Sequence, residues 1–545
     1  MKPILAVLTL LAIPVLLAQQ EAPQNDSIRQ SELRADLFFL ASDSMQGRLA
    51  ATAENRLAAE FIKSRFERLG LTPVGQNGSF FHEYNLTTAS LADNNQLLVA
   101  ADNANSERSL RLLQDYYPLN FSASGRARGD LAFAGFGIVS PERGHDDYSG
   151  GTVAGKVVLV FDHEPGERDQ NSVFDGVVRS EVSRNLRKAL FAQEQGAVAL
   201  LIVSDVHNHT GPNNFQTQAN STWPVNPRRV PRYTLSAWMD QVRIPVAQIS
   251  PAVASTLIHT SGYTLEKLSE AAEIDGGVTP IPMTERTVEI TATVDRRVIP
   301  DRNVVAMLEG SDPELSDELI IICAHYDHDG VANGQVFNGA DDDGSGTVAL
   351  LEIAEAFARA AADGMRPRRS VLFAAWNSEE RGLLGAWAYT EQPIVPLEQT
   401  AAVLNMDMVG RNEEVPVGGG RRFNGLEIQT AESNKNSVNI MGYTYSPDLQ
   451  TEVQEANEAY GLRLKMEYDN NASNLLRRSD QWPFLQKGVP AIFFHTGLHP
   501  DYHTPYDRPE KINYQKLETI AKLVHQVAWN IAQNPSRPRY AARTP

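Results

Sequence analysis

Three largely apolar runs, residues 319–324, 370–376 and 401–407, constrain the fold of this chain more than any other feature. Strands that are apolar on both faces are typical of a sheet covered by helices on both sides. A helical pattern at 346–361 lies between the first two runs. The alternation predicts an α/β domain with a mixed, mainly parallel central sheet flanked by helices.

Each of these runs ends in polar residues. In chain order, the first is followed by His325 and Asp327, the second by Glu379 and Glu380, and the third ends at Asp407. Ligands of open α/β sheets bind at the carboxyl ends of the strands, so we expect these side chains to share one edge. Five motifs are rich in carboxylates and imidazoles: HYDHDG (325–330), NGADDDGSG (338–346), NSEERGLLG (377–385), NMDMVG (405–410) and PDYHTPYD (500–507).

Taken singly, each motif has an ordinary interpretation. A lone His-x-Asp is more often a surface or core pair than a metal site. Three aspartates at 341–343 suit a solvated turn, a helix N-cap or a calcium loop. The pair Glu379-Glu380 suits a helix start, where acidic residues favour the macrodipole. Together, at consecutive strand ends, the carboxylates and imidazoles predict a catalytic zinc site.

With these motifs the chain resembles the two-zinc exopeptidases, a family that includes secreted bacterial aminopeptidases, glutamate carboxypeptidase and the catalytically inactive transferrin receptor. The resemblance runs from about residue 30 to 540. It includes AFAGFGIVSPERGHDDYSG (132–150) followed by GKVVLV (155–160), which looks like the opening of a protease-associated domain. The resemblance implies a zinc exopeptidase fold with an inserted, mostly β protease-associated domain.

The resemblance also implies two zinc ions and their ligands. His325 and Asp407 would bind one ion, Glu380 and His503 the other, and Asp341 would bridge them. In the family the peptide between the aspartates corresponding to 341 and 342 is cis.

Three further residues take roles from the same resemblance. Glu379 would be the general base, Asp327 the carboxylate that orients the His325 ring, and Tyr502 a group that polarises the substrate carbonyl. The chain departs from many relatives at Gln481, where they have histidine. Because this position is not a ligand, we expect only the rim of the pocket to differ.

The predicted organisation is a first part of the peptidase domain at 26–125, an inserted domain at 126–275, and a second part with the metal site at 280–540. The insert shows strand-like runs, one good helix at 181–195, and no cluster of catalytic residues. His207 and His209 resemble a ligand pair but lack a third partner in the sequence. His328, His495 and His499 are expected to surround the site rather than to add ligands.

The N-terminal 18 residues have the pattern of a secretory signal peptide: Lys2, an apolar run at 4–17, then Ala18. The alternative is an uncleaved anchor, although the run is short for a membrane span. Cys323 is the only cysteine, so no intramolecular disulfide forms, and its apolar surroundings favour a buried small side chain. We expect a secreted or periplasmic protein without a stable membrane anchor.

The formal net charge of −18 argues against nucleic acid or an anionic membrane as a partner, because both require a basic face. Peptides are the expected substrates, and the aminopeptidase reaction is the first hypothesis. The alternatives are a carboxypeptidase for acidic C-termini, with Arg477 and Arg478 as the nearby basic residues, a one-zinc glutaminyl cyclase, and a binding protein that has lost its metals. The complete set of predicted ligands argues against the last two.

Overall fold

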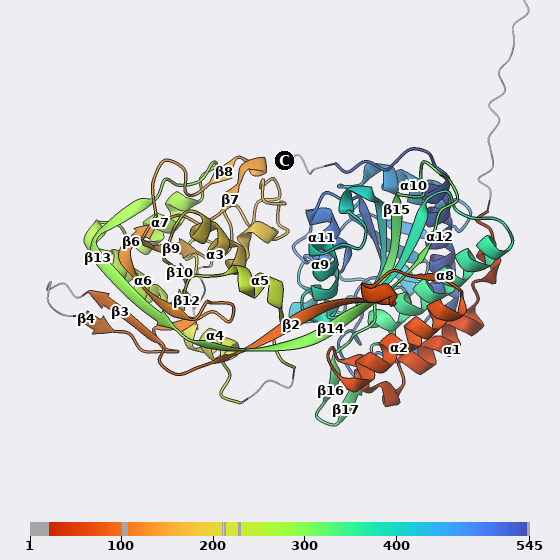
Figure 1. Cartoon of the computed structure of the whole chain (residues 1–545), viewed down its shortest axis with the longest axis horizontal. Helices are drawn as coiled ribbons and strands as arrows, with labels where there is room; N and C mark the ends of the chain where they lie inside the picture. Colours follow the sequence, from red (N-terminus) through yellow and green to blue (C-terminus); the bar gives the residue numbers. More distant parts are fainter. Residues whose placement is uncertain (1–20, 101–106, 210, 212–213, 227–229, 542–545) are drawn as a thin grey trace, which may run out of the picture.

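The computed structural model describes residues 21–100, 107–209, 211, 214–226 and 230–541, and Figure 1 shows them arranged as two lobes. One lobe is built on a ten-stranded sheet and the other on an eight-stranded sheet. The predicted signal peptide, residues 1–18, lies outside the described residues. Among the described residues, no helix combines the length and the apolar character that a membrane span requires.

The ten-stranded sheet contains the three apolar runs predicted from the sequence. Its central strands β18, β15, β19 and β22 are mutually parallel, and antiparallel strands extend it on both sides. In sheet order the strands are β11 (Thr234–Leu235), β2 (Phe81–Leu91), β14 (Val294–Leu308), β18 (Ser370–Trp376), β15 (Leu319–His325), β19 (Thr400–Met406), β22 (Ala491–His495), β20 (Ser437–Met441) and β21 (Arg463–Lys465), with β1 (Thr72–Pro73) also pairing with β14.

Helices cover both faces of this sheet, which explains why its strands are apolar throughout. Side chains alternate between the faces of a strand. Ile320 and Ile322 of β15 therefore pack into one core, and Ile321 and Cys323 into another. The first core includes α1 (Gln30–Leu40), α2 (Ala53–Arg68), α8 (Gly346–Ala362), α10 (Pro447–Asn457) and α12 (Tyr514–Gln533); the second includes α9 (Leu384–Glu391) and α11 (Gln481–Gln486), on the side of the other lobe in Figure 1. The predicted fold class is confirmed.

The eight-stranded sheet is also mixed, with β6, β9, β10 and β12 parallel to one another. Its strands in sheet order are β4 (Glu107–Ser109), β3 (Gln96–Ala100), β13 (Ile281–Ala292), β6 (Gly125–Phe133), β9 (Val157–Phe161), β10 (Ala199–Val203), β12 (Val246–Ile249) and β5 (Tyr116–Pro118). The sheet therefore uses a wider part of the chain than the predicted insert at 126–275.

This lobe has more helices than the single one expected from its sequence. They are α3 (Asn185–Glu194), α4 (Phe215–Thr222), α5 (Ser236–Gln241), α6 (Pro251–Ile258) and α7 (Leu265–Ala272). Helices α6 and α7 share a core with one face of the sheet, and α3 and α4 share a core with the other. The lobe therefore has three layers rather than being only strands and turns.

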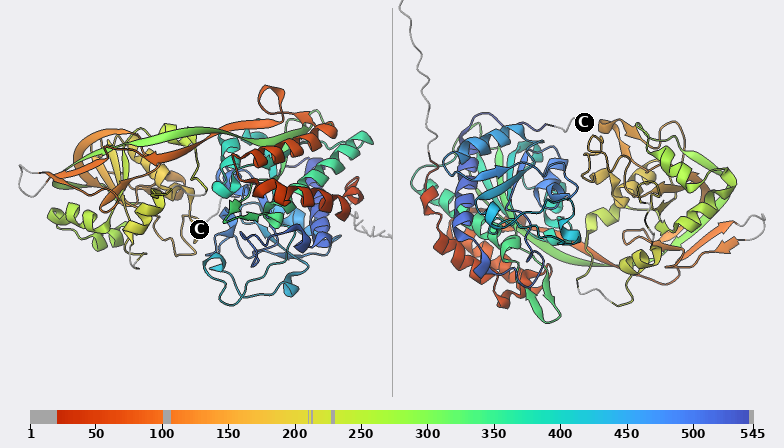
Figure 2. Two further views of the ribbon diagram at one scale, coloured as in Figure 1. Left: turned by 90° about the horizontal axis from the view of Figure 1, so that it is seen from below. Right: turned by 180° about the vertical axis from the view of Figure 1, so that it is seen from behind.

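Strands β2 and β14 form an antiparallel ribbon that joins the lobes, as Figures 1 and 2 show. The ladder runs from Phe81 opposite Val304 to Leu91 opposite Val294. After β2 the chain enters β3, and before β14 it leaves β13. Both β3 and β13 belong to the eight-stranded sheet. The lobes are thus connected by two paired strands.

Candidate metal centre

The carboxyl ends of the central parallel strands carry the acidic and imidazole side chains that the sequence singled out. Strand β15 ends at His325, β18 leads into Glu379 and Glu380, and β19 is followed by Asp407. Because β18, β15 and β19 are neighbours and parallel, these residues meet at one edge of the sheet. His503 reaches the same place from the loop between β22 and α12.

The first group of close side chains contains His325, Asp342 and Asp407, all buried. The Nε2 atom of His325 lies 3.3 Å from Oδ1 of Asp342 and 3.6 Å from Oδ1 of Asp407. The same nitrogen is 3.8 Å from Oε2 of Glu379. One imidazole nitrogen therefore faces three carboxylates.

A second group adjoins the first and shares Asp342 with it. The Nε2 atom of His503 lies 3.0 Å from Oδ2 of Asp342 and 3.3 Å from Oε2 of Glu380. Oδ1 of Asp342 thus faces His325, while its Oδ2 faces His503. A carboxylate with one oxygen in each group has the arrangement expected of a bridging ligand.

The structure places Asp342 in the position that the sequence analysis gave to Asp341. The Asp341 carboxylate instead accepts hydrogen bonds from the Gly410 amide at 2.7 Å and the Ser345 hydroxyl at 3.1 Å, and contacts His499 Nε2 at 3.2 Å. The cis peptide likewise joins Asp342 to Asp343, one bond later than predicted. The prediction for this loop was therefore displaced by one residue.

The loop that presents Asp342 is held by buried hydrogen bonds. Oδ2 of Asp507 accepts from the amides of Asp341 at 2.9 Å and Asp342 at 3.2 Å. The Asp343 carboxylate accepts from the His325 amide at 3.0 Å, which links the loop to the end of β15. These contacts fix the Asp342 backbone relative to the strand ends.

His328 and Asp329 also border the second group; His328 was expected to surround the site, whereas Asp329 was not predicted there. Nδ1 of His328 lies 2.7 Å from Oε1 of Glu380, and its side chain is fully buried. Oδ2 of Asp329 is 3.1 Å from Nδ1 of His503, so it can orient that ring. Both residues belong to the HYDHDG motif, and the His-x-x-His spacing within it was the available signal.

Asp327 contacts two parts of the site. Its backbone oxygen lies 3.2 Å from Nδ1 of His325, and its Oδ1 is 3.6 Å from the same nitrogen. Oδ1 also accepts a hydrogen bond from the Glu379 amide at 3.0 Å. Asp327 therefore contacts the His325 ring and also holds the backbone of Glu379. The second of these contacts was not predicted from the sequence.

A cavity of about 30 Å³ opens against these groups. That volume is large enough to hold a water molecule. Its lining includes Glu379, Asp342, Asp407, Tyr502 and His503, and does not include Glu380. The two adjacent glutamates thus lie in different places: one faces the cavity, while the other contacts His328 and His503.

The buried polar atoms of this centre fit bound cations. His325 Nε2, Asp342 Oδ2, Glu380 Oε1 and Asp407 Oδ1 are buried without a hydrogen-bond partner, whereas buried polar groups are normally satisfied. Burial raises the pKa of Glu379, and the neighbouring Glu380 and Asp407 carboxylates raise it further. So many acids in one buried space require positive charge, and the oxygen and nitrogen donors suit zinc.

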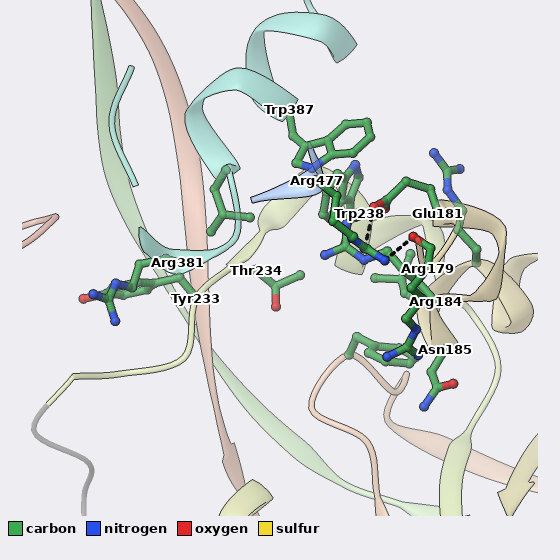
Figure 3. A pocket seen from close by; sticks show the side chains of 14 residues that line it. Arg179, Glu181, Arg184, Asn185, Tyr233, Thr234, Trp238, Arg381, Trp387 and Arg477 are labelled. Atoms are coloured by element: carbon green, nitrogen blue, oxygen red, sulfur yellow. Dashed lines mark hydrogen bonds and ion pairs between the residues drawn. The ribbon is translucent and has the colours of Figure 1, made fainter. Parts of the chain in front are cut away.

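A larger cavity of about 410 Å³ lies between the lobes. Figure 3 shows that Arg179, Glu181 and Arg184 of the eight-stranded lobe line it together with Arg381 and Arg477 of the ten-stranded lobe. Glu181 forms ion pairs with Arg184 at 2.8 Å and Arg477 at 2.9 Å. Arg187 also lines the cavity, which brings the number of arginines to five. Among the described residues that line it, Glu181 is the one acidic residue.

Three other positions that the sequence analysis discussed are not among the potential ligands. Gln481 is fully buried, accepts a hydrogen bond from Asn405 at 3.1 Å and donates one to the Leu476 carbonyl. It is therefore part of the core beneath the site rather than of a pocket rim. Arg478 lines the small cavity, whereas Arg477 lines the large one.

Comparisons with known proteins found several similar chains. Two curated relatives are similar to the chain: a probable glutamate carboxypeptidase, AMP1, from Arabidopsis thaliana, 31% identical over 212 residues, covering 38% of this chain and 26% of the relative; and aminopeptidase YwaD from Bacillus subtilis, 25% identical over 229 residues, covering 41% and 43%. The chain thus spans less than half the length of either. A solved aminopeptidase from Aneurinibacillus sp. strain AM-1 is 17% identical, with 95% of this chain and 98% of that chain covered and a TM-score of 0.47.

The model of one protein family matches residues 303–528. This segment begins in β14, contains β15, β18, β19 and β22, and includes every residue of the metal centre described above. The exopeptidase resemblance seen in the sequence motifs is confirmed by this match, which is to the model of peptidase family M28.

Proposed function

We propose that this chain is an exported two-zinc exopeptidase that removes single residues from the ends of peptides, with the amino-terminal end as its first target. The observation that supports the proposal most is the placement of Asp342, whose two oxygens face two different groups of ligands. One zinc would be held by His325, Asp342 and Asp407, and the other by Asp342, Glu380 and His503. When bound, the metal would supply Lewis acidity and lower the pKa of a bound water toward ~7.

Glu379 is the proposed proton carrier. It faces the small cavity, and its burial and acidic neighbours favour the protonated form once a proton has been taken up. It would accept a proton from the attacking water and pass it to the departing amine. Asp327 holds the Glu379 amide, so the carboxylate is positioned before the substrate arrives.

Tyr502 and His503 are adjacent and their rings are 4.0 Å apart between centroids. Tyr502 lines the cavity, and burial raises the pKa of its hydroxyl well above the usual range. It therefore remains protonated and can donate a hydrogen bond to the oxygen of the scissile carbonyl as negative charge develops there.

The eight-stranded lobe is proposed to be the inserted protease-associated domain, forming one wall of the substrate entrance. It supplies half of the arginine-rich cavity and contacts the other lobe beside the metal centre: the Val177 amide donates to Asn470 and the Arg179 amide to Asn474, at 3.2 and 3.1 Å. Residues 1–18 are proposed to direct export.

The arginine-rich cavity supports a second candidate, a carboxypeptidase for acidic C-termini. Arginines bind carboxylates in bidentate geometry, and a cavity with five of them suits the side chain or terminus of an acidic peptide. The relative from Arabidopsis thaliana is named a probable glutamate carboxypeptidase. A glutaminyl cyclase or a metal-free binding protein is less well supported, because both groups of ligands are complete.

A substrate panel separates the two candidates. Aminoacyl p-nitroanilides test the aminopeptidase, and N-acetylated peptides ending in glutamate test the carboxypeptidase. The proposal expects turnover of the first and none of the second. Arg184→Ala would lower turnover of acidic peptides selectively if the cavity binds them, whereas the exposed Arg243→Ala is a matched control outside the cavity. If only the N-acetylated peptides were turned over, the aminopeptidase proposal would be wrong and the carboxypeptidase would take its place.

A further inference from the structure

A second set of potential ligands lies in the eight-stranded lobe: His163, Glu167 and His209. Oε2 of Glu167 is 2.9 Å from Nδ1 of His163, and its Oε1 is 2.6 Å from Nε2 of His209. The two imidazole rings are 4.1 Å apart between centroids. The donor atoms of all three residues fall within 4.8 Å of one another, so a single cation can reach all of them.

The three residues follow adjacent parallel strands. His163 and Glu167 lie in the loop after β9, and His209 lies in the loop after β10. This is the carboxyl edge of the parallel part of the sheet, where ligands of α/β sheets bind. The backbone of His163 also has a φ of 65°, a left-handed conformation that side chains other than glycine seldom adopt.

Hydrogen bonds between the two loops hold these residues together. Glu273 of the segment after α7 accepts from the Gly166 amide at 2.8 Å and from the Asn208 side chain at 2.5 Å, so it ties both loops to one carboxylate. Asp162 accepts from the Asp205 amide at 2.9 Å. These contacts place His209 opposite Glu167 independently of any ion.

Neighbouring acidic groups are already engaged. Asp205 accepts from the amide of His207 at 2.8 Å and from the Ser269 hydroxyl, and it is fully buried. The side chains of the three potential ligands remain partly open to solvent, with exposed fractions of 27% for His163, 15% for Glu167 and 39% for His209. An ion can therefore enter, and water can complete its coordination.

We propose that His163, Glu167 and His209 form a third metal site, specific for zinc or a related transition metal and separate from the catalytic centre. Two imidazoles and one carboxylate are a common donor set for such ions, and a hard cation such as calcium would instead require mainly oxygen ligands. Because its ligands come from two loops, the ion would fasten the edge of the eight-stranded sheet. It would take no part in peptide hydrolysis.

The experiment uses the full chain, stripped of metal with a chelator and titrated with Zn²⁺ against a chromophoric indicator. His163→Ala and His209→Ala are the test variants. His207→Ala is the matched control, since this exposed histidine is two residues from His209 and outside the cluster. Each test variant should bind one equivalent fewer than the wild type, and the control should bind the wild-type number. Turnover of a small substrate should stay within a few-fold in all three.

Several outcomes would overturn the proposal. Equal Zn²⁺ binding by wild type and both test variants would leave only a pair of histidine–glutamate ion pairs. A fall in turnover as large as that of His325→Ala would make the site catalytic. If the alanine variants fail to fold, Glu167→Gln keeps the shape of the side chain and tests the same count. Since the readout is a difference between variants, it is independent of whether the catalytic centre holds two ions.

Discussion

The adjacent residues Glu379 and Glu380 provide the sharpest test of the proposed chemistry. Glu379 lines the small cavity and lies 3.8 Å from Nε2 of His325. Glu380 contacts His328 at 2.7 Å and His503 at 3.3 Å and does not line that cavity. We therefore expect Glu379→Gln to impair proton transfer and Glu380→Gln to impair metal binding.

The size of the first effect follows from the role. Glutamine has the shape of glutamate but cannot take up a proton, so the variant should lose the roughly 10²–10⁴-fold contributed by a positioned acid–base group. At about 1.4 kcal/mol per factor of ten, this is about 3–6 kcal/mol added to the barrier. The affinity for peptide should change little, because the loss occurs in the transition state.

The assay measures turnover and bound metal in the same preparation of each variant. Glu379→Gln should keep its metals and lose turnover, whereas Glu380→Gln should lose metal and recover part of its turnover in excess zinc. If both glutamates only favoured the start of a helix, each substitution would cost below ~1 kcal/mol of stability and leave the rate unchanged. Near-normal turnover of metal-loaded Glu379→Gln would refute the proposed mechanism.

Three further predictions use other parts of the structure. Removal of metal with phenanthroline should abolish activity, and zinc or cobalt should restore it. Metal analysis of the His209→Ala variant, which lacks the proposed third site, should give two ions at full activity. One ion would contradict the two-metal centre. Asp342→Asn should lower metal content and turnover together while Asp341→Asn keeps its metals, and the opposite result would return the bridging role to Asp341. Burial lowers the pKa of His525 to about 3. Below pH 6.5 this histidine is therefore protonated in the unfolded chain but still neutral in the native state. The free energy of unfolding should therefore fall as the pH drops from about 6.5 toward 3, by about 1.4 kcal/mol per pH unit from this group. Denaturant titrations at several pH values should show that the free energy of unfolding of His525→Gln depends less steeply on pH than that of the wild type. Equal dependence on pH would contradict the assignment.

The sequence indicated which side chains meet at this edge of the sheet, because strand ends are local features. His325, Glu379, Glu380 and Asp407 each follow an apolar run directly, and parallel pairing then brings them together. His503 could be placed only through the family resemblance, since it lies in a loop far from these strands in the sequence.

Spacing alone could not separate Asp341 from Asp342. The segment Ala340–Ser345 is a π-helical turn with non-helical dihedral angles at Asp342 and Asp343, so neither a helical nor a strand period applies across it. The placement of Asp342 among the other potential ligands depends on Asp507, which accepts a hydrogen bond from the Asp342 amide and lies 165 residues away in the sequence.

The eight-stranded lobe was predicted less accurately. Helices α4, α5, α6 and α7 have six to eight residues each, too few for a hydrophobic period to stand out. His209 looked like half of a pair with His207, although its partners in the structure are His163 and Glu167. That contact joins two loops, and no local pattern reports it.

The ribbon of β2 and β14 has a consequence for the modularity of the chain. Leu91 and Val294 are paired across the ribbon, so everything between them leaves and returns at neighbouring positions. A short turn joining these two residues would close an ordinary β-hairpin and keep the register of the ladder. The segment between them is thus topologically a long hairpin loop. A different module could replace it, and the ten-stranded sheet would lose only its edge strand β11, which lies within this segment.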